Sequence, residues 1–149
     1  MSQSMVVTIH RPAQRFDAMR ALVGASDEIG PMTRDALKRR APVGRPPNDS
    51  HPGRLRNSIR YERHTDGDGV TLEFAAHTPY AKYVVHGARP HEIRPVAAKA
   101  LHWYGPSGPV FATLVHHPGN QPNRFPEEVI RAVSGPVHDI IKAHMTGGL

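Results

Sequence analysis

The stretch that decides the fold is Ile59-Arg60-Tyr61-Glu62-Arg63-His64-Thr65-Asp66-Gly67-Asp68-Gly69-Val70-Thr71-Leu72-Glu73-Phe74. Apolar and polar residues alternate in two runs, one from Ile59 to Glu62 and one from Val70 to Phe74. Alternation with a period of two places one set of side chains on each face of a strand. The Asp-Gly segment between the runs is typical of a hairpin turn. We therefore predict a β-hairpin with one buried face.

Apolar residues at helical spacing precede this hairpin. The first stripe is Phe16, Met19, Leu22 and Val23, and the second is Ile29, Met32, Ala36 and Leu37. Because Gly24-Ala25-Ser26 separates the stripes and Ser26 suits an N-cap, we predict two helices, the first opened by Pro12 and the second stopped by Pro42. Before them, the β-branched run from Met5 to Ile9 predicts a short edge strand.

The sequence after the hairpin alternates short elements with loops. A helical face around Tyr80, Tyr83 and Val84 ends at Gly87, which suits a C-cap. Short strands are predicted at 92–94, 100–103 and 110–115, and a helix carries the most regular apolar stripe of the chain: Val129, Ile130, Val133, Val137, Ile140 and Ile141. We expect this last helix to kink or restart at Ser134-Gly135-Pro136.

Together these elements predict an α+β fold with N-terminal helices, a small antiparallel sheet built on the hairpin, and a C-terminal helix. A length of 149 residues fits one domain, 1–149, with a buried core. We expect flexible ends at 1–11 and 146–149 and an extended loop at 44–53, since that loop has no apolar residue other than proline.

The positive charge is confined to one segment. The chain has a net charge of +6, and the segment from Lys38 to Arg63 holds eight basic residues and two acids, which accounts for all of it. A local excess of this kind suits phosphates or an acidic protein surface. Tyr61 is the only aromatic residue in the segment, so stacking on single-stranded bases is disfavoured.

The sequence offers little for catalysis. There is no cysteine, which excludes disulfides, thiol nucleophiles and cysteine-bound metals. The chain has no Gly-x-Ser-x-Gly, no His-Glu-x-x-His and no phosphate-binding loop. Eleven histidines leave a metal-dependent enzyme using His86, His91 and His116 as the weakest alternative. We expect no catalytic residue, no metal and no cofactor. No apolar run reaches the ~18 residues of a membrane span, and the first residues do not resemble a signal peptide.

The order of several short motifs resembles a known family. A helix ends in Ala41-Pro42-Val43, and Gly53-Arg54-Leu55-Arg56-Asn57-Ser58-Ile59 leads into the hairpin. Pro79-Tyr80-Ala81-Lys82-Tyr83-Val84-Val85-His86-Gly87 follows it, then His117-Pro118-Gly119, and Phe125 opens the last helix. This order is similar to that of the head–tail connector family of long-tailed bacteriophages, also called neck or tail-completion proteins. The chain departs from the family pattern in a longer insertion at 44–52.

The resemblance implies a non-enzymatic virion protein, made in the cytoplasm of the bacterial host. It would form a homo-oligomeric ring, expected to be a hexamer, at the joint between the portal-connector complex and the tail tube. Its partners would be other copies of itself, the adjacent connector or stopper, the tail terminator or tail tube proteins, and genomic DNA held without sequence specificity in the channel. A tail terminator ring that caps the tail tube is the alternative within this class. A small module that binds nucleic acid non-specifically through Lys38–Arg63 is the alternative from another class.

Two sets of residues are candidates for contacts with neighbours. The first is expected to face a neighbouring ring or DNA and consists of Arg39, Arg40, Arg45, Arg54, Arg56 and Arg60. The second is expected to anchor an assembly interface, because aromatic side chains are enriched among interface hot spots. It consists of Trp103, Phe111 and Phe125.

Overall fold

The predicted hairpin is confirmed. In the computed structural model, which describes residues 3–10, 16–45 and 51–147, β2 (Ile59–Thr65) pairs antiparallel with β3 (Gly69–Ala76). The turn is held by the Asp66 carboxylate, which accepts hydrogen bonds from the backbone N–H of Asp68 (2.8 Å) and of Gly69 (2.9 Å). Such a side-chain turn is the reason why aspartate favours this position.

A third strand, β1 (Gln3–His10), pairs antiparallel with the other side of β3. The strand order is β1-β3-β2, which places β1 at an edge as predicted from Met5 to Ile9. Residues 3–10, which we expected within a flexible end, therefore belong to the sheet.

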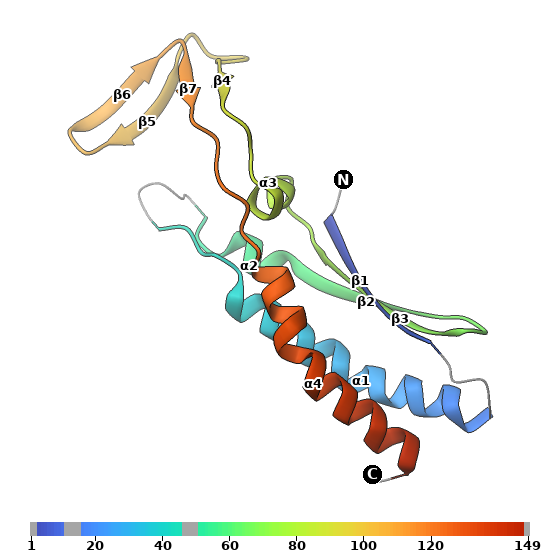
Figure 1. Cartoon of the computed structure of the whole chain (residues 1–149). Helices are drawn as coiled ribbons and strands as arrows, with labels where there is room; N and C mark the ends of the chain where they lie inside the picture. The colour runs from blue at the N-terminus through green and yellow to red at the C-terminus, as the bar shows by residue number, and fades with distance from the viewer. Residues whose placement is uncertain (1–2, 11–15, 46–50, 148–149) are drawn as a thin grey trace.

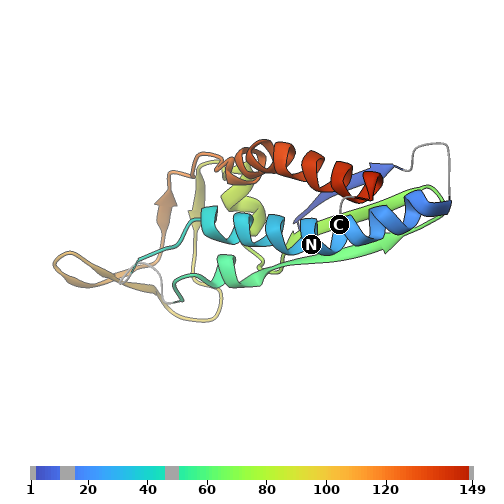
Figure 2. The ribbon, with the colours of Figure 1, turned by 90° about the horizontal axis from the view of Figure 1, so that it is seen from below.

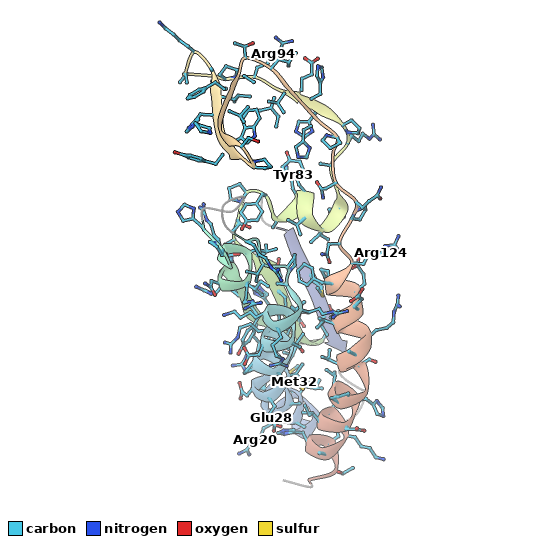
Figure 3. All side chains as sticks on the ribbon, turned by 90° about the vertical axis from the view of Figure 1, so that its left-hand side faces the viewer. Arg20, Glu28, Met32, Tyr83, Arg94 and Arg124 are labelled. Atoms are coloured by element: carbon cyan, nitrogen blue, oxygen red, sulfur yellow. The ribbon has the colours of Figure 1, made fainter. Side chains whose placement is uncertain are left out.

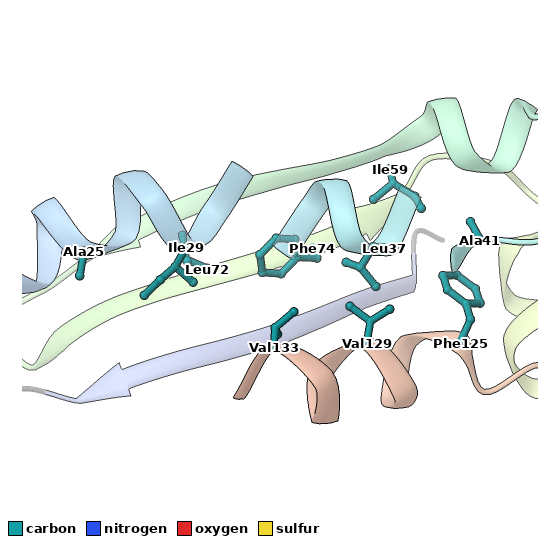
Figure 4. Packing of buried hydrophobic residues seen from close by; sticks show 10 residues of the cluster. All are labelled: Ala25, Ile29, Leu37, Ala41, Ile59, Leu72, Phe74, Phe125, Val129 and Val133. Atoms are coloured by element: carbon teal, nitrogen blue, oxygen red, sulfur yellow. The ribbon is translucent and has the colours of Figure 1, made fainter. Parts of the chain in front are cut away.

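Two long helices cover one face of this sheet and leave the other face open. They are α1 (Phe16–Arg40) and α4 (Phe125–Thr146), which lie side by side and run roughly along the strands (Figure 2). Leu72 and Phe74 of β3 point toward them and are at most 2% exposed. The sheet, α1 and α4 together form the body of the protein. Its core, shown in Figure 4, consists of Ala25, Ile29, Leu37, Ala41, Ile59, Leu72, Phe74, Phe125, Val129 and Val133.

The prediction of two N-terminal helices is wrong, because α1 is continuous from Phe16 to Arg40. Ser26 is no N-cap: it is buried in mid-helix, and its hydroxyl donates to the carbonyl of Val23 at 2.6 Å. The buried face runs through the supposed break, since Leu22, Ala25 and Ile29 are at most 1% exposed. Burial of this face stabilises the helix across Gly24 and Pro31 more than local propensity disfavours it. Pro12 lies outside the described residues.

The last helix is also continuous. Phe125 opens α4 as predicted, and the helix passes through Ser134-Gly135-Pro136, so of the expected kink or restart the restart is wrong. Its buried residues Val129 and Val133 lie one turn apart on the same face of α4, which packs against α1. The helix ends at Gly147, which has a φ of 70° and donates its N–H to the carbonyl of Ala143.

The remaining elements are short. They are α2 (Arg54–Ser58), α3 (Ala81–His86), β4 (His91–Ile93), β5 (Leu101–Gly105), β6 (Gly108–Ala112) and β7 (Val115–His117). Strand β4 pairs with β7, and β5 pairs with β6. The strand predicted over 110–115 is thus divided between β6 and β7. Figure 1 shows these four strands as an arm, residues 88–120, which projects from one end of the body beyond α3. Residues 46–50 of the predicted loop lie outside the described residues.

Candidate assembly surface

The arm is joined to the body at a narrow root made by two glycines. Gly87 (φ 78°) ends α3, and Gly119 (φ 81°) follows β7. Between them, Ala88 and Asn120 exchange two backbone hydrogen bonds of 3.0 Å. A Cβ at Gly87 would lie 2.6 Å from the carbonyl oxygen of Asn120, and one at Gly119 would overlap the carbonyl of Ala88. The glycines of two motifs far apart in the sequence therefore meet to hold the arm.

The same root is tied to α3 by the side chain of Asn120. Its amide donates to the carbonyl of Tyr83 at 2.8 Å, and the N–H of Asn123 donates to the carbonyl of Val84 at 3.0 Å. These bonds use carbonyls at the end of a short helix, which would otherwise need water or a cap. The direction in which the arm leaves the body is thus set by hydrogen bonds to backbone carbonyls of α3.

Replacing Gly119 with Ala should loosen the arm. A positive φ costs a non-glycine residue about 1–2 kcal/mol, and the overlap with Ala88 adds to this. Because 1.4 kcal/mol is a factor of ten, we expect trypsin cleavage after Lys99, an exposed residue of the arm, to become about tenfold faster. The control is Gly135→Ala in α4, where an added Cβ meets nothing within 4 Å. Equal cleavage of both variants would contradict this account of the root.

The outer hairpin of the arm exposes large apolar side chains. Trp103 is 41% exposed, Tyr104 63% and Phe111 68%. Pairing of β5 with β6 puts His102 opposite Phe111 and Trp103 opposite Val110, so both faces of the hairpin carry apolar groups. Trp103 and Phe111 are therefore exposed on the surface of the subunit, as a residue that anchors an interface must be.

Phe125 does not. It is 5% exposed and belongs to the core at the start of α4, where it packs inside the subunit. We correct the expectation that it is a surface anchor: an aromatic residue that opens an amphipathic helix is buried with the apolar face of that helix.

The six candidate arginines of the basic segment lie at the same end of the body as the arm (Figure 1), whereas Arg63 of that segment pairs with Asp27 in the middle of α1. The six candidates come from the last turn of α1, from Arg45, from α2 and from the start of β2, and all of them are exposed. Two of them have partners within the subunit. Arg40 donates two hydrogen bonds to the Glu128 carboxylate, at 2.7 and 3.0 Å, and Arg60 donates to the carbonyl of Asn57 at 2.7 Å.

The other four candidates make no ion pair with any residue in the described ranges. They are Arg39, Arg45, Arg54 and Arg56. Close by on α1, a hydrogen bond from Arg34 (2.7 Å) lowers the pKa of Asp35 below its usual value, and the charges of Lys38 and Arg39 lower it further. We call the end of the body that carries the six candidate arginines the basic end. Four of these arginines are exposed and available to a negatively charged partner.

The histidines proposed for a metal are not brought together. His91 stacks on His117 with ring centroids 5.0 Å apart, while His116 faces Glu92 at 3.6 Å. His86 is the last residue of α3. Across the described ranges, no three histidine or carboxylate side chains converge in a way that could hold a metal ion.

An apolar groove lies beside the root of the arm. It has a volume of about 510 Å³ and is walled by α3, the start of α4, α2 and the ends of β1 to β3. Its floor is apolar, with Leu55, Phe74 and Ile130 among the lining residues, and Glu127 and Arg131 add charge to its wall. Sequence reasoning did not find this groove, because its residues come from every part of the chain and share no local pattern.

A comparison with protein-family models identifies residues 6–87. They match the model of the HK97-gp10-like family, described as bacteriophage HK97-gp10, a proposed tail component. The chain belongs to this family. The match runs from β1 to the first glycine of the arm root, so it covers more than half of the chain. Neither the curated proteins nor the solved structures contain a match to the chain.

Membership in the HK97-gp10-like family makes this a structural protein of a phage particle, associated with the tail or the neck. Its site of action is therefore the virion, and its partners include other virion proteins. Phage structural components are typically not enzymes, which agrees with the lack of catalytic motifs in the sequence. None of the helices in the described ranges is both long and apolar enough to cross a membrane.

Proposed function

We propose that this protein forms a ring in the neck of a long-tailed phage, as a neck or tail-completion protein. The ring, with six subunits, joins the portal-connector complex to the tail tube and surrounds the DNA channel. The whole chain, 1–149, acts as one connector domain. The observation that carries this proposal is the family match together with the ordered motifs that continue beyond it to His117-Pro118-Gly119 and Phe125.

The surface supports such a role. The exposed arm and the basic end lie at the same end of the body, while α4 and the hairpin turn of β2 and β3 extend to the other (Figure 1). A subunit with a distinct end of this kind can contact a different protein on each side of a ring. Arg39, Arg45, Arg54 and Arg56 would meet phosphates or an acidic neighbouring ring.

Imaging of the phage neck by electron microscopy tests the proposal. We expect a sixfold ring of this protein between the portal complex and the tail tube. A ring that caps the upper end of the tail tube instead would favour the tail terminator, and absence of the protein from purified particles would refute both.

A module that binds nucleic acid non-specifically is the second candidate, favoured by the open arginines of the basic end. It predicts that the isolated protein shifts duplex DNA in a gel at low salt and loses about 10³–10⁵ in affinity between 50 and 200 mM salt, as for six to ten phosphate contacts. No shift at 50 mM salt would refute this candidate and leave the proposed ring untouched.

A further inference from the structure

The tip of the arm, the hairpin of β5 and β6, exposes large apolar side chains in the described part of the subunit. Among the described residues, the aromatic ring contacts of this hairpin are internal: His102 stacks on Phe111 (4.6 Å between centroids) and meets the edge of Tyr104 (5.3 Å). From Leu101 to Val115 the sequence contains no lysine, arginine, aspartate or glutamate. Pro109 removes one hydrogen-bond donor from β6, but the aromatic side chains of the strand pair stay exposed, and such a surface is normally shielded by charge, by further proline or by another chain.

The tip also lacks the structure that would stabilise it alone. A single two-stranded hairpin is marginally stable in water, and β5 and β6 form a sheet of only two strands. Figure 3 shows that the arm, marked by Arg94, extends away from α3, marked by Tyr83, and from the body, marked at its far end by Arg20. Within the described part of the subunit, Trp103, Tyr104 and Phe111 at the tip therefore stay exposed.

The groove beside the arm root is the complementary surface. Its volume of about 510 Å³ lies in the range of sites that enclose apolar ligands. Most of its lining is apolar, and the charges of Glu127 and Arg131 suit the hydroxyl and imidazole groups that Tyr104 and His102 would bring with them. The uncharged tip is not attracted electrostatically to the basic end, whereas burial of its apolar side chains in this groove is favoured by the hydrophobic effect.

We propose that the arm tip of one subunit docks into the groove of a second copy of the same chain. Tip and groove are different surfaces, so the contact is heterologous and each subunit can give one arm and receive another. Repetition of such a contact closes a ring when the rotation between subunits allows it. This inference rests on the proposed function only in placing the copies in a ring.

The area involved explains why a closed ring is favoured over a dimer. An aromatic side chain buries about 150–250 Å² in full, so Trp103, Tyr104 and Phe111 present roughly 300–400 Å² at their exposed fractions. With a matching area in the groove, one contact buries about 600–800 Å², which is less than the ~1,200 Å² of a stable pair. In a ring each subunit makes two such contacts, and the total then reaches the stable range.

Disulfide trapping tests the docking directly, because the natural chain has no cysteine. We combine two full-length variants, Phe111→Cys in the tip and Ile130→Cys in the groove, with a size tag on one of them. The expected result after mild oxidation is a mixed dimer that contains one chain of each variant. Because the cysteines are on separate chains, every disulfide of this kind joins two subunits.

The matched control replaces Ile130→Cys with Ala132→Cys, which is exposed on α4 and outside the groove. We expect at least a tenfold lower yield of mixed dimer with the control. Equal yields, or no mixed dimer at concentrations up to about 1 mM, would overturn the docking proposal. A neck ring without this cross-link would refute the docking alone, while the cross-link in a protein absent from virions would refute the proposed function alone.

Discussion

Replacing Val133 with Asp should remove a large part of the protein's stability. Val133 lies on the inner face of α4, 9% exposed, within the core shared by α1, α4 and the sheet. A buried charge without a partner costs about 3–5 kcal/mol, against a total stability of about 5–15 kcal/mol for a domain of ordinary size. We expect a loss of this size in the free energy of unfolding, measured by urea denaturation with circular dichroism.

The neighbouring residue supplies the control. Ala132 lies one position away on the same helix but faces solvent, so Ala132→Asp should change the stability by no more than about 0.5 kcal/mol. If both variants lost the same stability, the inner face of α4 would not contribute to the core as the structure shows. The pair therefore separates burial from the helix propensity of aspartate, which is the same in both.

The hairpin and the C-terminal helix could be predicted from the sequence because their signals are local. Alternation from Val70 to Phe74 reports the pleat of one strand, and the stripe from Val129 to Ile141 reports one helix face. The extent of α1 could not be predicted in this way. In the sequence Gly24 resembles a helix break. In the structure it lets α4 pack closely against α1, because an added Cβ would lie 3.0 Å from Nδ1 of His144 on α4.

Gly30 illustrates the same limit. In sequence it weakens a helix by about 1 kcal/mol relative to alanine. In the structure an added Cβ would lie 2.6 Å from Cζ of Tyr61, whose ring also packs against Phe74. Glycine is required at such positions because another element packs closely against the helix. The sequence of the helix alone does not show which element this is.

The candidate surface was predicted in part. The basic segment is contiguous in the sequence, so its charge could be counted, but Arg40 and Arg60 are engaged by Glu128 and by the carbonyl of Asn57. Trp103 and Phe111 are surface residues and Phe125 is a core residue, although composition alone cannot separate the three. The groove depends on several elements meeting in space, and no sequence window contains it.

The second large effect concerns the basic end. The double change Arg54→Glu/Arg56→Glu reverses two exposed charges on α2 that have no partner among the described residues. Surface changes of this kind usually alter stability by no more than about 0.5 kcal/mol, so the melting temperature should shift by less than about 2 °C. We expect the fold to remain intact while the particle fails to assemble or to infect.

The size of this functional loss follows from repetition in the proposed ring. An exposed charge pair contributes about 0.5–1 kcal/mol, which is small for one subunit. Six subunits that each lose this amount weaken a ring-to-ring contact by about 3–6 kcal/mol, or roughly 10²–10⁴-fold in an equilibrium constant. Plaque counts from a phage that lacks the gene, complemented with each variant, measure the loss.

The control reverses the same number of charges at the opposite end of the body. Arg20 and Lys142 are exposed there, near the start of α1 and the end of α4, so Arg20→Glu/Lys142→Glu has the same net charge as the test variant. Equal plaque counts for the two variants would show that the basic end is not part of the assembly surface.

If the α2 variant alone fails, the defective particles show which partner the basic end binds. Heads without tails indicate an acidic neighbouring ring, because docking itself is lost. Complete particles with altered DNA release indicate phosphates in the channel, because only the grip on DNA has changed.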